Sequence, residues 1–310
     1  MITALSLNPS IDRTLTVPKF TYGGLNRVSS EKQDAGGKGI NVSLVLRALN
    51  CDVCCAGFLH RETSPIFAKK LSAAGADYDF VFCPGATRTN LKILDAAAGI
   101  ITEINQSGRP VSPEELAQMT EIVRKHAQES SMMVLSGSVP PGCPGDYYEQ
   151  LIRLCREADC RCILDADGEK LAHGLKAAPF LIKPNRYELE QLSGRSLKNR
   201  REILAAAREI ISGGVSVVAV SLGAEGAMIV DKENALYAPP LPLQVNSTVG
   251  AGDSMVAGLA AAFDRGDSLE EAFRTGVAAA SAACLTEGTQ PFTPAQFEDC
   301  RRKVAMEYVR

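Results

Sequence analysis

The sequence predicts an α/β fold in which a central, mostly parallel sheet is covered by helices on both faces. Apolar strand-like runs alternate with segments of helical period for most of the 310 residues, and this order is typical of parallel sheets. The segment 40–49 has the helical period, with one apolar face made of Ile40, Leu44, Val45, Ala48 and Leu49. Buried strands are expected at residues 2–7, 132–135, 162–164, 180–182 and 215–220.

Three helix starts carry a capping box, in which Ser or Thr accepts the backbone N–H three residues on and Glu or Gln reaches back. The pairs are Ser112 with Glu115, Ser268 with Glu271, and Thr293 with Gln296. Two of these starts, at Pro113 and Pro294, also have proline at the first helical position, where proline is common. Helices are therefore expected after residues 112, 268 and 293.

Two segments, 13–32 and 88–105, break the alternation of strand and helix. Each alternates polar and apolar residues without a helical period, and each has a turn signal. The turns are expected at Gly23 and Gly24 and at Ala98 and Gly99. These segments predict a small antiparallel sheet that stands off a single domain spanning 1–310; the residues alone fit a lid over a pocket and an edge extension equally well.

Composition and charge exclude several classes of function. The net charge is −3 and no block of Lys or Arg occurs, which argues against nucleic acid or an anionic membrane as the main partner. Neither a signal peptide nor a long uncharged apolar run is found, so we expect a cytoplasmic protein. Its ten cysteines lack the paired spacing of metal knuckles and are expected as free thiols.

The strongest local signal is a glycine-rich turn at residues 246–253 that leads directly into an apolar helix ending near Phe263. The free N–H groups of such a helix start, together with its dipole, favour an anion. Asp253 stands at this helix start, where it is either an ordinary helix cap or a general base beside a phosphate. The turn does not fit the dinucleotide fingerprint, because Met255 replaces the required glycine.

A second glycine-rich turn at residues 35–41 opens the helix that includes Ile40 and carries Lys38 at its tip. The backbone, the Lys38 ammonium and the Asn41 amide are suited to a phosphate or sugar oxygen, and a plain loop with a solvated lysine fits as well. This is no Walker A loop, since Gly39 stands where Ser or Thr is required.

Taken together, these turns resemble the two signatures of the ribokinase-like carbohydrate kinases of the phosphofructokinase-B type. The resemblance covers essentially the whole chain and includes residues 35–41, 136–141, 183–188, 221–226 and 248–254. It implies a three-layer sandwich with a small β lid that also pairs two subunits into a homodimer. It also implies an ATP-dependent, Mg²⁺-requiring phosphotransferase that acts on a small sugar phosphate.

The resemblance implies a role for each matched residue. Asp253 is expected to be the catalytic base, and the N–H groups of Gly250, Ala251 and Gly252 the site that neutralises the transferring phosphoryl group. The sugar phosphate is expected at Asp12, Gly36, Gly37, Lys38, Asn41 and Arg88, with Arg27 and Ser138 as further contacts to the phosphate. The nucleotide is expected at Lys183, Asn185, Glu188, Ser221, Gly223 and Gly226, besides Gly250 and Gly252, with Mg²⁺ held indirectly through Asn185 and Glu188.

Within this family the chain looks most like bacterial kinases that phosphorylate fructose 1-phosphate at the 6-hydroxyl to give fructose 1,6-bisphosphate. Tagatose 6-phosphate is the alternative acceptor. A catalytically silent sugar-phosphate sensor is the alternative from another class, although a sensor has no need to retain Asp253 and its glycine turn.

Overall fold

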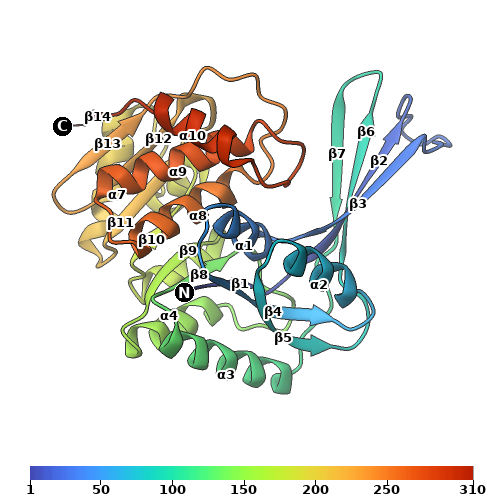
Figure 1. Cartoon of the computed structure of the whole chain (residues 1–310), viewed down its shortest axis with the longest axis horizontal. Helices are drawn as coiled ribbons and strands as arrows, with labels where there is room; N and C mark the ends of the chain where they lie inside the picture. Colours follow the sequence, from blue (N-terminus) through green and yellow to red (C-terminus); the bar gives the residue numbers. More distant parts are fainter. Residues whose placement is uncertain (310) are drawn as a thin grey trace.

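A ten-stranded sheet runs through the centre of the molecule (Figure 1). The structure, a computed structural model, describes residues 1–309. Seven neighbouring strands are parallel, in the order β5 (Asp77–Cys83), β4 (Val53–His60), β1 (Ile2–Ser6), β8 (Met132–Ser136), β9 (Arg161–Asp165), β10 (Leu181–Ile182) and β11 (Val217–Ser221). Three antiparallel strands continue it, β12 (Ala227–Val230), β13 (Ala235–Ala238) and β14 (Glu307–Tyr308).

The five strands predicted from apolar runs are all present in this parallel part, as β1, β8, β9, β10 and β11. Every residue of β1, β4 and β8 is buried, because helices cover both faces and leave no side for water. This is why these strands read as continuous apolar runs and not as alternating ones. The predicted α/β fold is confirmed.

Helices form a layer on each side of the sheet (Figure 1). One layer consists of α1 (Lys38–Ala48), α2 (Ser64–Ala73), α8 (Ala251–Asp264), α9 (Leu269–Ala283) and α10 (Pro294–Lys303). The other consists of α3 (Pro113–Glu129), α4 (Tyr147–Glu157), α5 (Gly168–Leu175), α6 (Arg186–Ser193) and α7 (Arg200–Ser212), and a short 3₁₀ turn, η1 (Gly223–Glu225), follows β11. Each layer buries its own apolar cluster against the sheet, so the site is built on a rigid scaffold.

The predicted capping boxes form at α3 and α10 but not at α9. At α9 the Ser268 side chain accepts the N–H of Glu271 at 3.3 Å, and the reciprocal bond is missing. The Glu271 carboxylate instead accepts hydrogen bonds from Arg274 at 3.2 Å and from Arg301 at 2.9 Å. Because two arginines bind the Glu271 carboxylate, it does not accept a hydrogen bond from the Ser268 N–H. The prediction of a full capping box at α9 was therefore wrong.

A second, four-stranded sheet stands off the main body, in the order β3, β2, β6, β7 (Figure 1). Its strands are β3 (Ser30–Gly36), β2 (Ser10–Val17), β6 (Thr89–Asp95) and β7 (Ile100–Asn105). We call it the lid sheet. It is not purely antiparallel as expected, because β2 and β6 pair in parallel. Both strands follow parallel strands of the main sheet, β1 and β5, so both leave the same edge and run outward together.

Strand register gives the lid sheet two different faces, since directly paired residues share a face. Asp12, Asn90 and Asn105 are paired across β2, β6 and β7 and form a polar face with Lys92. The opposite face, which we call the apolar lid face, carries Leu15, Leu91, Ile93, Ile100 and Ile104 beside the polar residues Arg13, Glu31 and Thr102. Ile100 and Ile104 are 61% and 56% exposed, so this face is uncovered in the single chain.

Polar residues gather at the carboxyl edge of the main sheet. Parallel strands end there in Ser6, Ser136, Asp165 and Ser221, and α1 and α8 begin nearby. Ligands of open α/β sheets bind outside this edge. None of the helices within residues 1–309 combines the length and the apolar composition that crossing a membrane requires.

Candidate active site

A polar cleft of about 340 Å³ lies where the lid sheet meets the carboxyl edge of the main sheet. The turn after β1, the start of α1, strand β6, the loop after β8 and the start of α8 all contribute to it. Its charged lining residues are Asp12, Lys38, Arg88, Asp167 and Asp253, and its polar ones include Asn8, Asn41, Asn90, Asn105, Ser138 and Thr289. The lining fits a polar ligand.

Asp253 is the third residue of α8 and points into this cleft. The helix is capped by Gly250, which has φ 81°, and no side chain closes the cap. Asp253 is 7% exposed, and its Oδ2 accepts a hydrogen bond of 2.8 Å from the Asn41 amide. Of the two interpretations of this carboxylate, the helix cap is therefore excluded.

The surroundings of Asp253 set its proton affinity. Burial raises its pKa to about 6, and the negative charge of Asp165 acts in the same direction. Lys38, the Asn41 hydrogen bond and Lys183 oppose this rise. A carboxylate with a pKa just below neutral is suited to accept a proton in a reaction.

The N-terminus of α8 offers free backbone donors beside Asp253. The Ala251 N–H donates to the Thr248 carbonyl at 3.3 Å, and the first bond of the helix runs from Ser254 N–H to the Gly250 carbonyl at 2.9 Å. Within residues 1–309 no acceptor pairs with the N–H groups of Gly250, Gly252 or Asp253. The N–H groups of Gly250, Gly252 and Asp253 are thus free to donate to a ligand, whereas the N–H of Ala251 is engaged within the turn.

Asp165, at the end of β9, joins two lysines. It is 1% exposed, and its Oδ2 accepts a hydrogen bond of 3.1 Å from Lys38, while its Oδ1 lies 3.3 Å from the Lys183 ammonium. Burial works to raise the pKa of Asp165, but the charges of Lys183 and Lys38 outweigh it and hold the pKa below its usual range. Burial likewise opposes the charge of Lys38, yet Asp165 and Asp253 raise the pKa of this ammonium above its usual value. Asp165 and Lys38 are therefore both charged.

A second group of predicted residues lies next to this cluster, at the ends of β10 and β11. Asn185 caps α6 through a full capping box. The Glu188 N–H donates to the Asn185 side chain at 2.8 Å, and the Asn185 N–H donates to the Glu188 carboxylate at 2.8 Å. Asn185 also forms a β-bridge with Ser221. Gly252 lies close to Lys183, as a Cβ at this glycine would be 3.5 Å from the lysine Nζ.

The chain is similar to known proteins. The model of the pfkB family carbohydrate kinases matches residues 5–296. A 1-phosphofructokinase from Rhodobacter capsulatus is 40% identical over 281 residues, covering 89% of this chain and 88% of the relative. The chain belongs to the pfkB family of carbohydrate kinases.

Solved structures agree with this membership. Phosphofructokinase-2 from Escherichia coli in complex with fructose-6-phosphate superposes with a TM-score of 0.90 and 32% identity, covering 97% of this chain and 98% of the other. Ribokinase from Arabidopsis thaliana complexed with ribose and ATP, 23% identical, has a TM-score of 0.81 with coverages of 97% and 98% and shares the fold. This pfkB carbohydrate kinase therefore has the ribokinase-like fold and is a phosphotransferase.

Most residues expected at the sugar phosphate lie at the cleft of this kinase. Asp12, Gly37, Lys38, Asn41, Arg88 and Ser138 line it. Gly36 lies behind Asp12 and has to be glycine, because a Cβ there would come within 2.9 Å of the Asp12 carboxylate.

Arg88 lines the cleft, but its guanidinium is already engaged. It donates to the Asn8 carbonyl at 3.0 and 3.2 Å, to Asn90 Oδ1 at 2.9 Å and to the Gln106 carbonyl at 2.9 Å. Arg88 can therefore present a positive charge to an anion, but a two-bond fork to a phosphate requires it to release one of these partners.

Arg27 is not brought to the cleft of its own chain. It lies exposed in the connection between β2 and β3, at the outer end of the lid sheet, and it is absent from the lining of the cleft. Sequence position alone did not reveal this, because the length of the β2–β3 hairpin carries the residue outward.

Several residues at the site were not singled out from the sequence. Asp165 is the most important, and its signal was its position directly after a predicted buried strand. Asn8, Asn90, Asn105, Asp167 and Thr289 also line the cleft. They were missed because each comes from a different loop or strand and carries no motif of its own.

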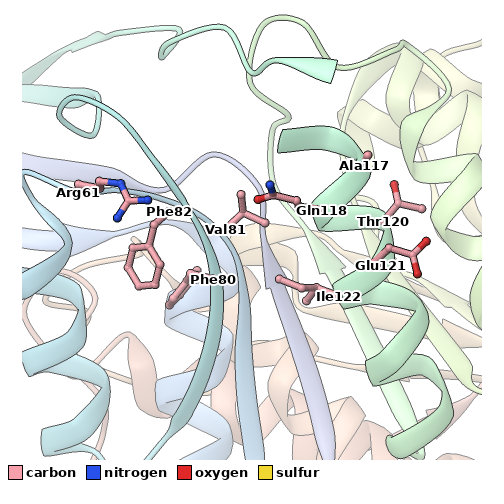
Figure 2. Close-up of a pocket in the computed structure, with 9 residues that line it drawn as sticks. All are labelled: Arg61, Phe80, Val81, Phe82, Ala117, Gln118, Thr120, Glu121 and Ile122. Atoms are coloured by element: carbon pink, nitrogen blue, oxygen red, sulfur yellow. The ribbon is translucent and has the colours of Figure 1, made fainter. Parts of the chain in front are cut away.

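A larger cavity of about 820 Å³ lies away from this site, between β5 and α3. Figure 2 shows Phe80, Val81 and Phe82 on its strand side and Thr120 and Glu121 on its helix side. It lacks the convergent lysines, carboxylates and free amides of the polar cleft. The smaller cleft is therefore the candidate active site.

Proposed function

We propose that this carbohydrate kinase transfers the γ-phosphoryl group of ATP to the 6-hydroxyl of fructose 1-phosphate, giving fructose 1,6-bisphosphate and ADP. The observation that carries the proposal is the placement of Asp253, a buried carboxylate at a helix N-terminus that shares one cleft with Lys38 and Arg88. The Rhodobacter capsulatus relative, a 1-phosphofructokinase, supports fructose 1-phosphate as the acceptor.

The proposed reaction is a direct displacement at phosphorus. Asp253 accepts the proton of the 6-hydroxyl, whose oxygen forms a bond to the γ-phosphorus. The bond from that phosphorus to the β-γ bridging oxygen breaks, and ADP leaves with the electron pair. The free N–H groups of Gly250 and Gly252 and the helix dipole stabilise the charge on the group in transfer.

The cations of the cleft support an acceptor that already carries a phosphate. Lys38 and Arg88 both line the cleft, where their positive charges can attract a phosphate of the acceptor. Asn41 lines the same cleft and donates a hydrogen bond to Asp253. The proposed base and the proposed sugar contacts are therefore held in one position relative to each other. Positioning of this kind is the main contribution of a protein to phosphoryl transfer.

The residues near Lys183 fit a nucleotide with Mg²⁺. Within residues 1–309 no three His, Cys, Asp or Glu side chains converge as metal ligands. Asn185 and Glu188 are hydrogen-bonded to each other's backbone in the cap of α6. Oδ1 of Asp165 accepts no hydrogen bond, and its ion-pair partner is the Lys183 ammonium at 3.3 Å. Mg²⁺ would supply charge neutralisation of the phosphates, held chiefly through ATP, with the Glu188 carboxylate reached indirectly.

We also propose a homodimer through the lid sheet. The uncovered apolar lid face supports pairing with a second copy, because contiguous exposed apolar surface marks interaction sites. Arg27 lies at the outer end of the same sheet, away from its own cleft, and a second copy would bring its cleft within reach of this cation.

We further propose that the enzyme works in the cytoplasm. All ten cysteines are free thiols, and free thiols in this number fit a reducing compartment.

An ADP-release assay with fructose 1-phosphate, fructose 6-phosphate, tagatose 6-phosphate and fructose tests the function. We expect kcat/KM for fructose 1-phosphate to exceed each of the others by about tenfold or more, which a hydrogen-bonded site achieves readily. A preference for tagatose 6-phosphate would replace the acceptor. Binding of a sugar phosphate in calorimetry without ADP release under Mg-ATP would identify a sensor and overturn the proposal.

A further inference from the structure

The charge of the polar cleft does not match its proposed substrate. Its lining contains three carboxylates, Asp12, Asp167 and Asp253, and only two cations, Lys38 and Arg88. A sugar phosphate adds further negative charge to this space. Like charges at close range in a partly buried site disfavour binding, so some of these carboxylates need compensation from behind.

Asp12 receives such compensation from Lys92. The Lys92 ammonium donates to Asp12 Oδ2 at 3.3 Å, and the two side chains are 17% and 19% exposed. Lys92 does not line the cleft itself. Of the residues that the structure describes, Lys92 alone places a cationic nitrogen within 4 Å of the Asp12 carboxylate.

The other contacts of Asp12 are neutral. Its Oδ1 accepts hydrogen bonds from Ser10 at 2.8 Å and from Asn90 at 3.1 Å, and Gly36 lies so close that a Cβ there would be 2.9 Å from the carboxyl group. These contacts already fix the direction of the side chain. What Lys92 adds is positive charge at the second oxygen, in a place where water has little access.

We propose that Lys92 is a positioning and specificity-determining residue, which neutralises Asp12 so that this carboxylate can hold sugar hydroxyls while the same cleft accepts a phosphate. The inference rests on the proposed function, because it takes a phosphorylated sugar as the acceptor. Lys92 acts through Asp12 and does not touch the substrate.

The test is a double-mutant cycle with fructose 1-phosphate and Mg-ATP. Lys92→Met should raise KM for fructose 1-phosphate by about ten- to a hundredfold, the usual range for a lost charge-assisted bond, and change kcat by less than about threefold. In an Asp12→Asn background, where no charge is left to neutralise, the same change should alter KM by less than about threefold. Lys92→Arg should restore KM to within about threefold of the wild type.

Lys70→Met is the matched control. Lys70 also forms a part-buried ion pair at the lid sheet, to Asp34 at 2.8 Å, and donates to the Ala35 carbonyl at 2.7 Å, without contact to Asp12. The Lys70→Met variant measures the effect on KM of loosening the lid sheet without any change at Asp12 or Lys92. We expect this effect to be smaller than that of Lys92→Met. Thermal unfolding of each variant shows that it is folded.

The inference is overturned by any of three results: an unchanged KM in Lys92→Met, a loss of the same size in the Asp12→Asn background, or a failure of arginine to restore KM. Absence of fructose 1-phosphate turnover in the wild type would instead refute the proposed function, so the two failures are distinguishable.

Discussion

The two halves of the cleft differ in how completely the single chain builds them. On the main-sheet side, Asp253, Asp165 and Lys183 are each at most 7% exposed. Asp253 accepts a hydrogen bond from Asn41, and Asp165 forms an ion pair with Lys183. On the lid side, every residue of β7 is exposed and the apolar lid face is uncovered. The main-sheet half is thus a buried, finished surface, whereas the lid half leaves apolar surface uncovered in the single chain.

The largest effect should come from the main-sheet half. Asp253→Asn keeps the shape and the contact with Asn41 but removes the proton acceptor, so kcat should fall by about 10²- to 10⁴-fold. Steady-state ADP release measures this, and circular dichroism checks the fold. Near-normal turnover in a folded variant would remove Asp253 as the base.

The same half should control the pH profile. With Asp253 as the proposed base and a pKa of about 6, activity should fall about tenfold per pH unit below 6 as the carboxylate takes up a proton. Asp165→Asn removes a charge that raises this pKa, so the acid limb should move to lower pH. A limb that stays in place in Asp165→Asn would contradict this coupling.

Asp165→Asn should also lower kcat by about tenfold, because Lys38 and Lys183 lose the shared carboxylate that positions them. The rate at the pH optimum, compared between variant and wild type, measures this apart from the shift of the limb. A profile that shifts with no loss at its optimum would mean that the lysines are held by other contacts.

The lid half is tested by the double variant Ile93→Asp with Ile104→Asp. Two carboxylates on the apolar lid face should prevent pairing of two copies, and KM for the sugar should rise by about tenfold if the partner supplies Arg27. Light scattering gives the mass, and Ile66→Asp, an exposed isoleucine on α2 (39% exposed), is the matched control. An unchanged dimer would place the interface elsewhere.

The smallest effect is expected at a residue that does not line the cleft. Ser112→Ala removes the side-chain acceptor of the α3 capping box and should cost about 1 kcal/mol of unfolding free energy. Kinetic constants at 25 °C should not change. Denaturant unfolding measures the loss, and a change in KM would show that α3 is coupled to the cleft.

What could be predicted from the sequence depended on locality. The strands, the helix starts at Ser112 and Thr293, and the glycine turns at Lys38 and Asp253 follow from residues that are neighbours in the chain. Asp165 was missed because its importance comes from lysines 127 and 18 positions away. The parallel pairing of β2 with β6 was missed because alternation reports which residues share a face but not which strands meet.

That parallel pairing has a consequence for how the molecule is assembled. The hairpins β2–β3 and β6–β7 are local and can form within microseconds, but their shared seam joins segments separated in sequence by α1, β4, α2 and β5. Closing so long a loop is slow and becomes favourable only once the intervening units are in place. During refolding, catalytic activity should therefore return later than the bulk of the helical signal.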